Sequence, residues 1–194
     1  MLKISTMTGK LAGLKAINTS PLANSYCKRM SRTSAVCSKC YSIRMVSTYR
    51  KNCNPAWERN GTQLSKPVAF WELPKFKDGA VVRYNGHGEL LNLLHAINLF
   101  KIAYTSPRAK FSLFTKRFRL VQNAIDILGK PKNLQLVYSS PKLNKKSKLP
   151  KYFDRVFTVY DHDCEDINCG TRNCINCMVC YTDNGIIAVN ERLK

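Results

Sequence analysis

The sequence predicts an α/β fold with a largely parallel β-sheet. Strand-like and helix-like segments alternate between residues 80 and 160, at the spacing typical of strand–helix–strand units. The chain has 194 residues, the length of one ordinary domain, and its 44% of apolar residues can supply a core. We therefore expect residues 1–194 to form a single domain, with residues 80–160 as its β/α core.

The elements of the core follow from the spacing of apolar residues. Short apolar runs bounded by turn residues predict strands, and apolar residues recurring about every 3.6 positions predict helices. Expected strands lie at 80–84, 111–115, 134–138, 155–160 and 185–189, and expected helices lie at 89–104 and 117–128. Upstream, residues 41–64 are weakly helical with a break at 52–55, and residues 142–151 read as a basic loop.

Polar residues follow each of the first four predicted strands of the core. These are residues 85–89, then Lys116 and Arg117, then residues 139–142, and finally residues 161–164. In parallel sheets the functional site lies off the carboxyl ends of the strands. We therefore expect the functional site at this edge of the sheet.

The charge of the chain is strongly basic, with 32 Lys and Arg against 12 Asp and Glu, a formal net charge of +20. Solubility of a small domain needs a charge magnitude of only about 2–8, and a larger positive field favours polyanions. Nucleic acid is the expected partner, and an acidic host protein is the alternative. The candidate nucleic-acid contacts are Lys116, Arg117, Arg119, Lys142, Lys145, Lys146 and Lys148.

A membrane partner is not expected, because no run reaches the ~18 apolar residues that a spanning helix needs. The segment 90–104 is the most apolar, but polar residues interrupt it at helical spacing. The first residues, Met1 to Lys3, lack the apolar stretch of a signal peptide. The expected location is therefore the cytoplasm.

The nine cysteines fall into two sets, one within residues 27–53 and one within residues 161–181. An odd number of cysteines in a cytoplasmic chain argues against a disulfide framework and favours metal binding. Two cysteines separated by two residues can direct both sulfurs to the same ion or cluster, because the turn between them is tight.

The C-terminal set predicts a cysteine-rich metal loop. Cys174, Cys177 and Cys180 repeat the two-residue spacing, and either Cys164 or Cys169 would complete a four-thiolate site. This set suits structural zinc and an iron–sulfur cluster equally well.

The N-terminal set offers three sulfurs, from Cys27, Cys37 and Cys40, and leaves one coordination position open. Three thiolates suit a [4Fe–4S] cluster with one free iron better than a closed structural zinc site. Cys53 reads as a small buried residue. Zinc stays open as the alternative metal for the chain as a whole.

Four blocks of the sequence together resemble one known family. They are Cys27 followed by Cys37-Ser38-Lys39-Cys40-Tyr41, residues 82–90 with the turn Gly86-His87-Gly88-Glu89, residues 114–116, and Cys174 to Tyr181. These blocks resemble the phage-encoded gene-product-eighty-eight-like family, which is itself similar to radical S-adenosylmethionine (SAM) proteins. The resemblance covers roughly residues 5 to 181, and it depends on the order of the blocks.

The resemblance implies a partial (β/α) barrel with mostly parallel strands, one or two [4Fe–4S] clusters, and SAM as a possible cofactor. Gly86 and Gly88 would let the backbone approach SAM closely, and Glu89 would receive its amino group. Glu89 and Lys116 are then the candidate catalytic residues. The sequence departs from radical SAM proteins in its cysteine motif, because nine residues rather than three separate Cys27 from Cys37, and the aromatic Tyr41 follows Cys40 instead of preceding it. The chain is also short for a full barrel, for which ~250 residues is typical. A phage-encoded protein would be located in the host cytoplasm.

The expected function is that of an iron–sulfur protein of radical-SAM-like architecture that acts on or with nucleic acid, with enzymatic activity left open. The alternative is a zinc-stabilised, non-catalytic module that binds nucleic acid or a host protein. The oligomeric state is not predicted.

Overall fold

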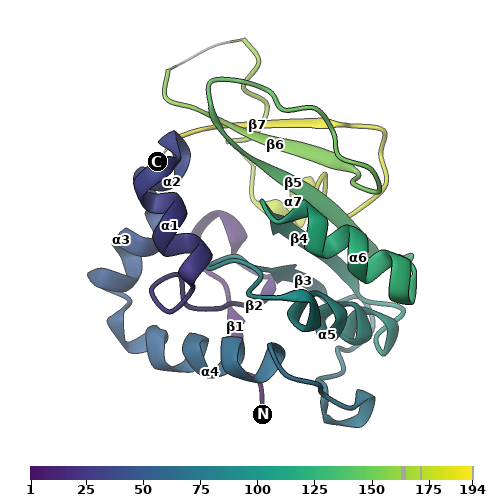
Figure 1. Ribbon diagram of the computed structural model, residues 1–194. Helices are drawn as coiled ribbons and strands as arrows, with labels where there is room; N and C mark the ends of the chain where they lie inside the picture. Colours follow the sequence, from purple (N-terminus) through teal and green to yellow (C-terminus); the bar gives the residue numbers. More distant parts are fainter. Residues whose placement is uncertain (163–164, 171, 194) are drawn as a thin grey trace.

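The chain forms one seven-stranded sheet in the computed structural model, which describes residues 1–162, 165–170 and 172–193 (Figure 1). The strands follow one another across the sheet in the order of the sequence. They are β1 (Ile4–Thr6), β2 (Lys15–Ile17), β3 (Val81–Tyr84), β4 (Lys110–Thr115), β5 (Leu134–Leu143), β6 (Arg155–Tyr160) and β7 (Ala188–Arg192). β1 runs antiparallel to β2, and every later neighbour is parallel. The predicted α/β fold with a mostly parallel sheet is confirmed.

Helices connect the parallel strands. Between β2 and β3 lie α1 (Ser25–Thr33), α2 (Ala35–Ser38), α3 (Tyr41–Ser47) and α4 (Asn54–Leu64), with short 3-10 turns at Lys51–Cys53 and Phe70–Glu72. α5 (Leu93–Tyr104) joins β3 to β4, and α6 (Phe118–Leu128) joins β4 to β5. A further 3-10 turn at Gly9–Leu11 precedes β2, and α7 (Cys174–Cys177) precedes β7.

The two faces of the sheet are covered differently, because successive strand residues point to opposite faces. Val82 and Leu113 point to the main core, where they meet apolar residues of α4, α5 and α6. Val81 points to the other face, where a smaller cluster includes Leu14 and Tyr181 with the C-terminal cysteine segment packed against it. These three helices and the C-terminal cysteine segment therefore lie on opposite sides of the central strands.

Three predicted elements have different boundaries. The strand expected at 185–189 lies three residues later, as β7. The other two differences have a local cause. The helix expected from residue 89 begins at Leu93, because the Asn92 side chain accepts a hydrogen bond from the His95 backbone N–H at 2.9 Å and caps the helix there. Glu89 is therefore not an acid in a first helical turn. The strand expected to end at 138 continues to Leu143, since it pairs with β6 through a register irregularity, so the basic loop begins later than expected.

The sheet also extends beyond residues 80–160, to β1 and β2 on one side and β7 on the other. The strands β1 and β2 have only three residues each, too few for a visible alternation. α1 has no buried residue among its nine, so it carries no apolar stripe that a sequence pattern could reveal. In the described part of the chain, no helix has the length and apolarity that crossing a bilayer requires.

We expect acid to destabilise the fold partly through His95, which is fully buried in α5. Its Nδ1 accepts a hydrogen bond from the Leu91 backbone N–H at 3.2 Å. Burial, with a smaller contribution from Arg117, lowers the pKa of His95 from 6.5 to about 3. Below about pH 6.5 the imidazole of the unfolded chain is protonated, while that of the folded protein stays neutral. The free energy of unfolding therefore falls as the pH drops below about 6.5.

Urea unfolding as a function of pH measures this effect. The midpoint should fall between about pH 6.5 and pH 4, and less steeply for His95→Gln than for the wild type. His162→Gln is the control, because that side chain is 57% exposed. Equal slopes for the wild type and His95→Gln would contradict the assignment.

Candidate functional site

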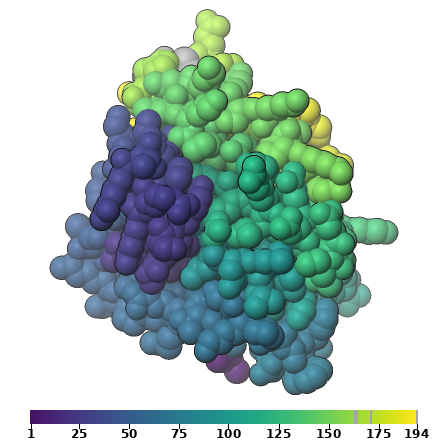
Figure 2. All heavy atoms as spheres, in the orientation of Figure 1, coloured from purple at the N-terminus to yellow at the C-terminus, as the bar shows by residue number. Residues whose placement is uncertain are grey.

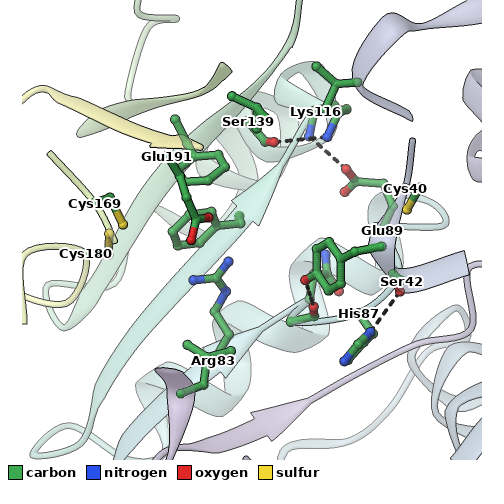
Figure 3. Close-up of a pocket in the computed structure, with 18 of the residues that line it drawn as sticks. Cys40, Ser42, Arg83, His87, Glu89, Lys116, Ser139, Cys169, Cys180 and Glu191 are labelled. Carbon is green, nitrogen blue, oxygen red and sulfur yellow. Dashed lines mark hydrogen bonds between the residues drawn. The ribbon is translucent and has the colours of Figure 1, made fainter. Parts of the chain in front are cut away.

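A cavity of about 240 Å³ opens at the carboxyl ends of the central strands, on the face opposite α4, α5 and α6 (Figure 3). Glu89 reaches it from the loop after β3, Lys116 from the end of β4, and Ser139 from β5. Phe114 and Phe157 form part of its wall. This is the edge at which the polar strand ends predict a functional site.

Both cysteine sets contribute to this one cavity. Cys37 and Cys40 line it from the N-terminal set, and Cys169, Cys174 and Cys180 line it from the C-terminal set. Figure 3 shows Cys40 on one side and both Cys169 and Cys180 on the opposite side. Cysteines more than a hundred residues apart in sequence therefore meet across a single space.

Two further candidate ligands do not line the cavity. Cys27 and Cys177 belong to α1 and α7 and are not among the residues that line it. Cys164 lies outside the described residues. Cys53, expected to be a small buried residue, is half-buried at the end of a 3-10 turn.

Three successive helices carry the N-terminal set. α1 begins after Asn24, whose side chain accepts hydrogen bonds from the backbone N–H groups of Tyr26 and Cys27, and α2 begins after Ser34, which accepts from Cys37. Cys40 stands at the start of α3. Side-chain caps therefore fix the starts of α1 and α2, the two helices that carry Cys27 and Cys37.

The pKa of the Cys27 thiol depends on its burial and on the acidic groups near it. Burial raises it most, and the negative charges of Glu89, Cys40 and Cys37 raise it further. In the C-terminal set, burial raises the pKa of Cys180 to about 12, with Cys169 and Cys174 adding to it. The unliganded thiols of Cys27 and Cys180 are therefore protonated at neutral pH, and a metal would bind to them in exchange for their protons.

The arrangement of the thiols bears on whether they could hold zinc or an iron–sulfur cluster. Among the residues described, no three His, Cys, Asp or Glu side chains converge to hold a metal ion. Tetrahedral zinc needs all its ligand atoms within about 2.0–2.3 Å of one point. In an iron–sulfur cluster each thiolate binds a different iron, so the sulfurs need not converge on one point. The described residues therefore present no ready-made site for a single metal ion.

Glu89 is the most heavily bonded group at the cavity. Its Oε1 accepts hydrogen bonds from the Leu90 backbone N–H at 2.8 Å and from the Thr115 hydroxyl, and its Oε2 accepts from the Lys116 backbone N–H at 2.8 Å. Burial raises the pKa of this carboxyl, and the three hydrogen bonds oppose the rise. Glu89 thus joins the loop after β3 to the end of β4.

Gly86 and Gly88 are constrained by the protein itself. A methyl group on Gly88, which has a φ of +83°, would lie 2.3 Å from the Thr19 carbonyl oxygen. A methyl group on Gly86 would lie 2.9 Å from the Asn18 side-chain oxygen. The loop after β3 therefore needs glycine in order to pack against the loop after β2.

His87 lies between these two glycines. It is buried, its ring stacks on Trp57 at 4.4 Å, and its Nδ1 lies 2.9 Å from the Ser42 hydroxyl. Burial, followed by the charges of Arg50 and Arg83, lowers the pKa of His87 to about 4. The imidazole at the cavity is therefore neutral at neutral pH.

Sequence reasoning missed Arg83, which projects from β3 toward the middle of the cavity (Figure 3). Its guanidinium lies 3.1 Å from the centre of the Phe114 ring, and its buried Nε has no hydrogen-bond partner. In the described ranges no acidic side chain forms a salt bridge with it. The signal in the sequence is an arginine inside the buried run Val81-Val82-Arg83-Tyr84.

Another cation at the cavity, Lys10, has no such signal in the sequence. Its Nζ lies 2.7 Å from Glu191 Oε1 and 3.0 Å from Cys169 Sγ. The fully buried Arg155 of β6 donates hydrogen bonds to the Thr182 carbonyl at 2.6 Å and to Asn184 at 2.9 Å. Basic residues thus hold the C-terminal cysteine segment against the sheet.

The predicted nucleic-acid contacts are dispersed, and only Lys116 lines the cavity. Its Nζ donates to Ser139 at 3.0 Å. Arg117 donates to the Leu90 and Leu91 carbonyls, which makes it a clamp on the loop after β3. Lys146 pairs with Asp166 at 2.9 Å. The others, Arg119, Lys142, Lys145 and Lys148, are exposed outside the cavity.

Comparison with known proteins gives one match. The family model described as gene product 88 matches residues 4–190, a span that includes both cysteine sets and the cavity-lining residues from Lys10 to Tyr181. No curated protein and no solved structure matches the chain.

Proposed function

The chain belongs to the gene product 88 family, and from that premise we propose that it is an iron–sulfur protein of radical-SAM-like architecture that acts on or with nucleic acid. The observation that carries the proposal is the arrangement of Cys27, Cys37 and Cys40. These cysteines follow the first parallel strand on three consecutive helices, and two of them face the strand-end cavity that also holds Glu89 and Lys116.

The architecture supports a partial (β/α) barrel. Strands β3, β4 and β5 follow one another in sequence order and are joined by α5 and α6 on the face of the main core, as in a (β/α) barrel, whereas no helix joins β5 to β6. The cavity lies on the face away from those helices, which corresponds to the inside of such a barrel. The finer assignment of a curved, partial barrel is part of the proposal.

The two cysteine sets supply the protein ligands of the proposed metal centres. Cys27, Cys37 and Cys40 would hold a [4Fe–4S] cluster, and Cys169, Cys174, Cys177 and Cys180 are the candidates for a second centre. A bound cluster would supply electrons to the cavity. Arg83 and Lys116 place positive charge beside the bound group, and the neutral His87 can accept a proton.

Binding of the SAM amino group requires a free acceptor position on Glu89. A carboxylate offers about four acceptor positions. Three protein donors already use three of them, two on Oε1 and one on Oε2. One position on Oε2 therefore remains for the amino group of a ligand, and this supports Glu89 as a ligand-binding residue as well as a link between two strand ends.

We expect protein purified without oxygen to contain about four iron and four sulfide ions for each cluster it holds. Cys40→Ser should remove the iron of one whole cluster, because a site of three thiolates that loses one has two left. Iron and sulfide analysis, together with the visible absorption spectrum, measures the loss.

Cys53→Ser is the matched control for this experiment, since Cys53 belongs to the same sequence region but does not line the cavity. It should keep the full iron content. Stoichiometric zinc without iron would reject the proposal and favour the zinc-stabilised, non-catalytic alternative. Iron content unchanged by Cys40→Ser would also contradict it.

A further inference from the structure

We infer that a single-stranded nucleic acid binds along a groove on α1, α2 and α3 and reaches the cavity across Cys37 and Cys40. This α1–α3 groove has a volume of about 660 Å³, and its polar lining consists of Lys39, Arg44 and the hydroxyl groups of Ser31, Ser38, Ser47 and Thr48. The inference rests on the proposed function, because it names the surface and the form of the nucleic acid that the site would accept.

Charge around the groove favours a polyanion. Residues 25–59 contain eight basic residues and a single acidic one, Glu58. Lys28, Arg29 and Arg32 of α1 are exposed, as is Arg44 of α3. In Figure 2 the purple segment of α1 and α2 lies on the molecular surface beside the blue segment of α3 and α4. An exposed surface with this charge balance attracts phosphates over a long range.

The lysine-rich segment at residues 142–148 is a weaker candidate, although the sequence pattern favours it. Four acidic residues follow β6 within residues 161–166. Asp166 pairs with Lys146 at 2.9 Å, and Asp161 accepts a hydrogen bond from Asn144 at 2.7 Å. These contacts bring negative charge to the lysine segment and reduce the positive field there.

The chemistry of the groove lining matches a sugar–phosphate backbone. Protein contacts to phosphate come mostly from Lys and Arg side chains, from Ser and Thr hydroxyls and from backbone N–H groups. The groove provides two cations and four hydroxyls. Lys39 lies 3.6 Å from Asp161 and is still 52% exposed on its side chain, so a phosphate can compete for it.

The groove and the cavity adjoin each other. Cys37, Lys39, Cys40 and Leu193 line both of them. A backbone in the groove would therefore pass directly over the two cysteines at the cavity entrance. From there, one nucleotide could enter the cavity toward Arg83 and Lys116.

Aromatic residues at this entrance favour a single strand over a duplex. Tyr41 is 41% exposed and lines the cavity, and its hydroxyl donates to the Gly86 carbonyl at 2.6 Å, which holds the ring in place. Tyr49 is 74% exposed and follows Thr48 of the groove. Exposed rings stack on unpaired bases, and a base must leave a duplex before it can enter a cavity.

Fluorescence anisotropy with a labelled oligothymidylate, an oligouridylate and a DNA duplex of equal length tests the inference. The Lys39→Gln/Arg44→Gln variant should bind the single strands about tenfold more weakly, and its slope of log affinity against log salt should be shallower by about 1.4, since each lost phosphate contact removes about 0.7. Lys145→Gln/Lys148→Gln removes the same charge from the other candidate surface and should bind like the wild type.

The outcomes separate this inference from the proposed function. Arg44→Gln alone changes an exposed side chain, should keep the iron content, and should still weaken binding. Binding that follows this pattern in a protein without iron would reject the cluster and keep the groove. The inference would be overturned if the groove variants bound like the wild type, if the control pair lost binding, or if the duplex bound more tightly than the single strands. The cluster proposal would still be decided by its iron analysis.

Discussion

Gly88→Ala is expected to destabilise the protein by about 2–5 kcal/mol. A residue with a side chain in the left-handed region costs about 1–2 kcal/mol, and Gly88 has a φ of +83°. The added methyl group would also lie 2.3 Å from the Thr19 carbonyl oxygen, a backbone atom that cannot simply rotate away. Overpacking of this kind costs about 1–3 kcal/mol more. Urea unfolding measures the loss.

Gly79→Ala separates the two causes. Gly79 has a similar φ of +74°, but a methyl group there would meet nothing within 4 Å. We expect only the conformational cost of about 1–2 kcal/mol at this position. If the two substitutions cost the same, contact with Thr19 does not determine the need for glycine at position 88.

Glu89→Gln is expected to cost about 2–4 kcal/mol in unfolding free energy. The carboxylate accepts three hydrogen bonds through both of its oxygens. An amide of the same shape has one oxygen, and its NH₂ group would face at least one of the donors from Leu90, Thr115 and Lys116. A buried donor without an acceptor costs about 1–3 kcal/mol, and Glu89 is buried.

Glu72→Gln provides the matched comparison. The Glu72 carboxylate also accepts a backbone hydrogen bond, from Ala69 at 2.9 Å, but the residue is exposed and water can replace that contact. We expect a change within about 0.5 kcal/mol there. Chemical denaturation of both variants at one pH gives the comparison, and equal small losses would show that Glu89 does not hold the two strand ends together.

Elements with a buried face were predictable from the sequence. The strand expected at 155–160 matches β6, and those expected at 111–115 and 117–128 match β4 and α6 to within one residue. Their apolar residues repeat with the period of the element, because one face of each is buried. The short strands β1 and β2 and the exposed helix α1 carry no such period, and they were not predicted.

Individual residues of the candidate site were predictable from the sequence, but their arrangement in space was not. Cys37, Cys40, Glu89 and Lys116 stand out by their type and by their position after strands, and the structure brings them to one cavity. The contact between Lys10 and Glu191 joins residues 181 positions apart. No local pattern marks such a pair, since neither residue has an unusual neighbourhood in the sequence.

By itself, the sequence determined the class of fold, the edge of the sheet at which polar groups collect, and the thiols available for a metal centre. Tertiary structure alone decided that the two cysteine sets share a cavity, that Arg83 lies between them, and that the basic surface of α1–α3 adjoins it. The physical reason is that periodicity and residue type report the burial of a single element. Which elements face one another depends on the path of the whole chain across the sheet.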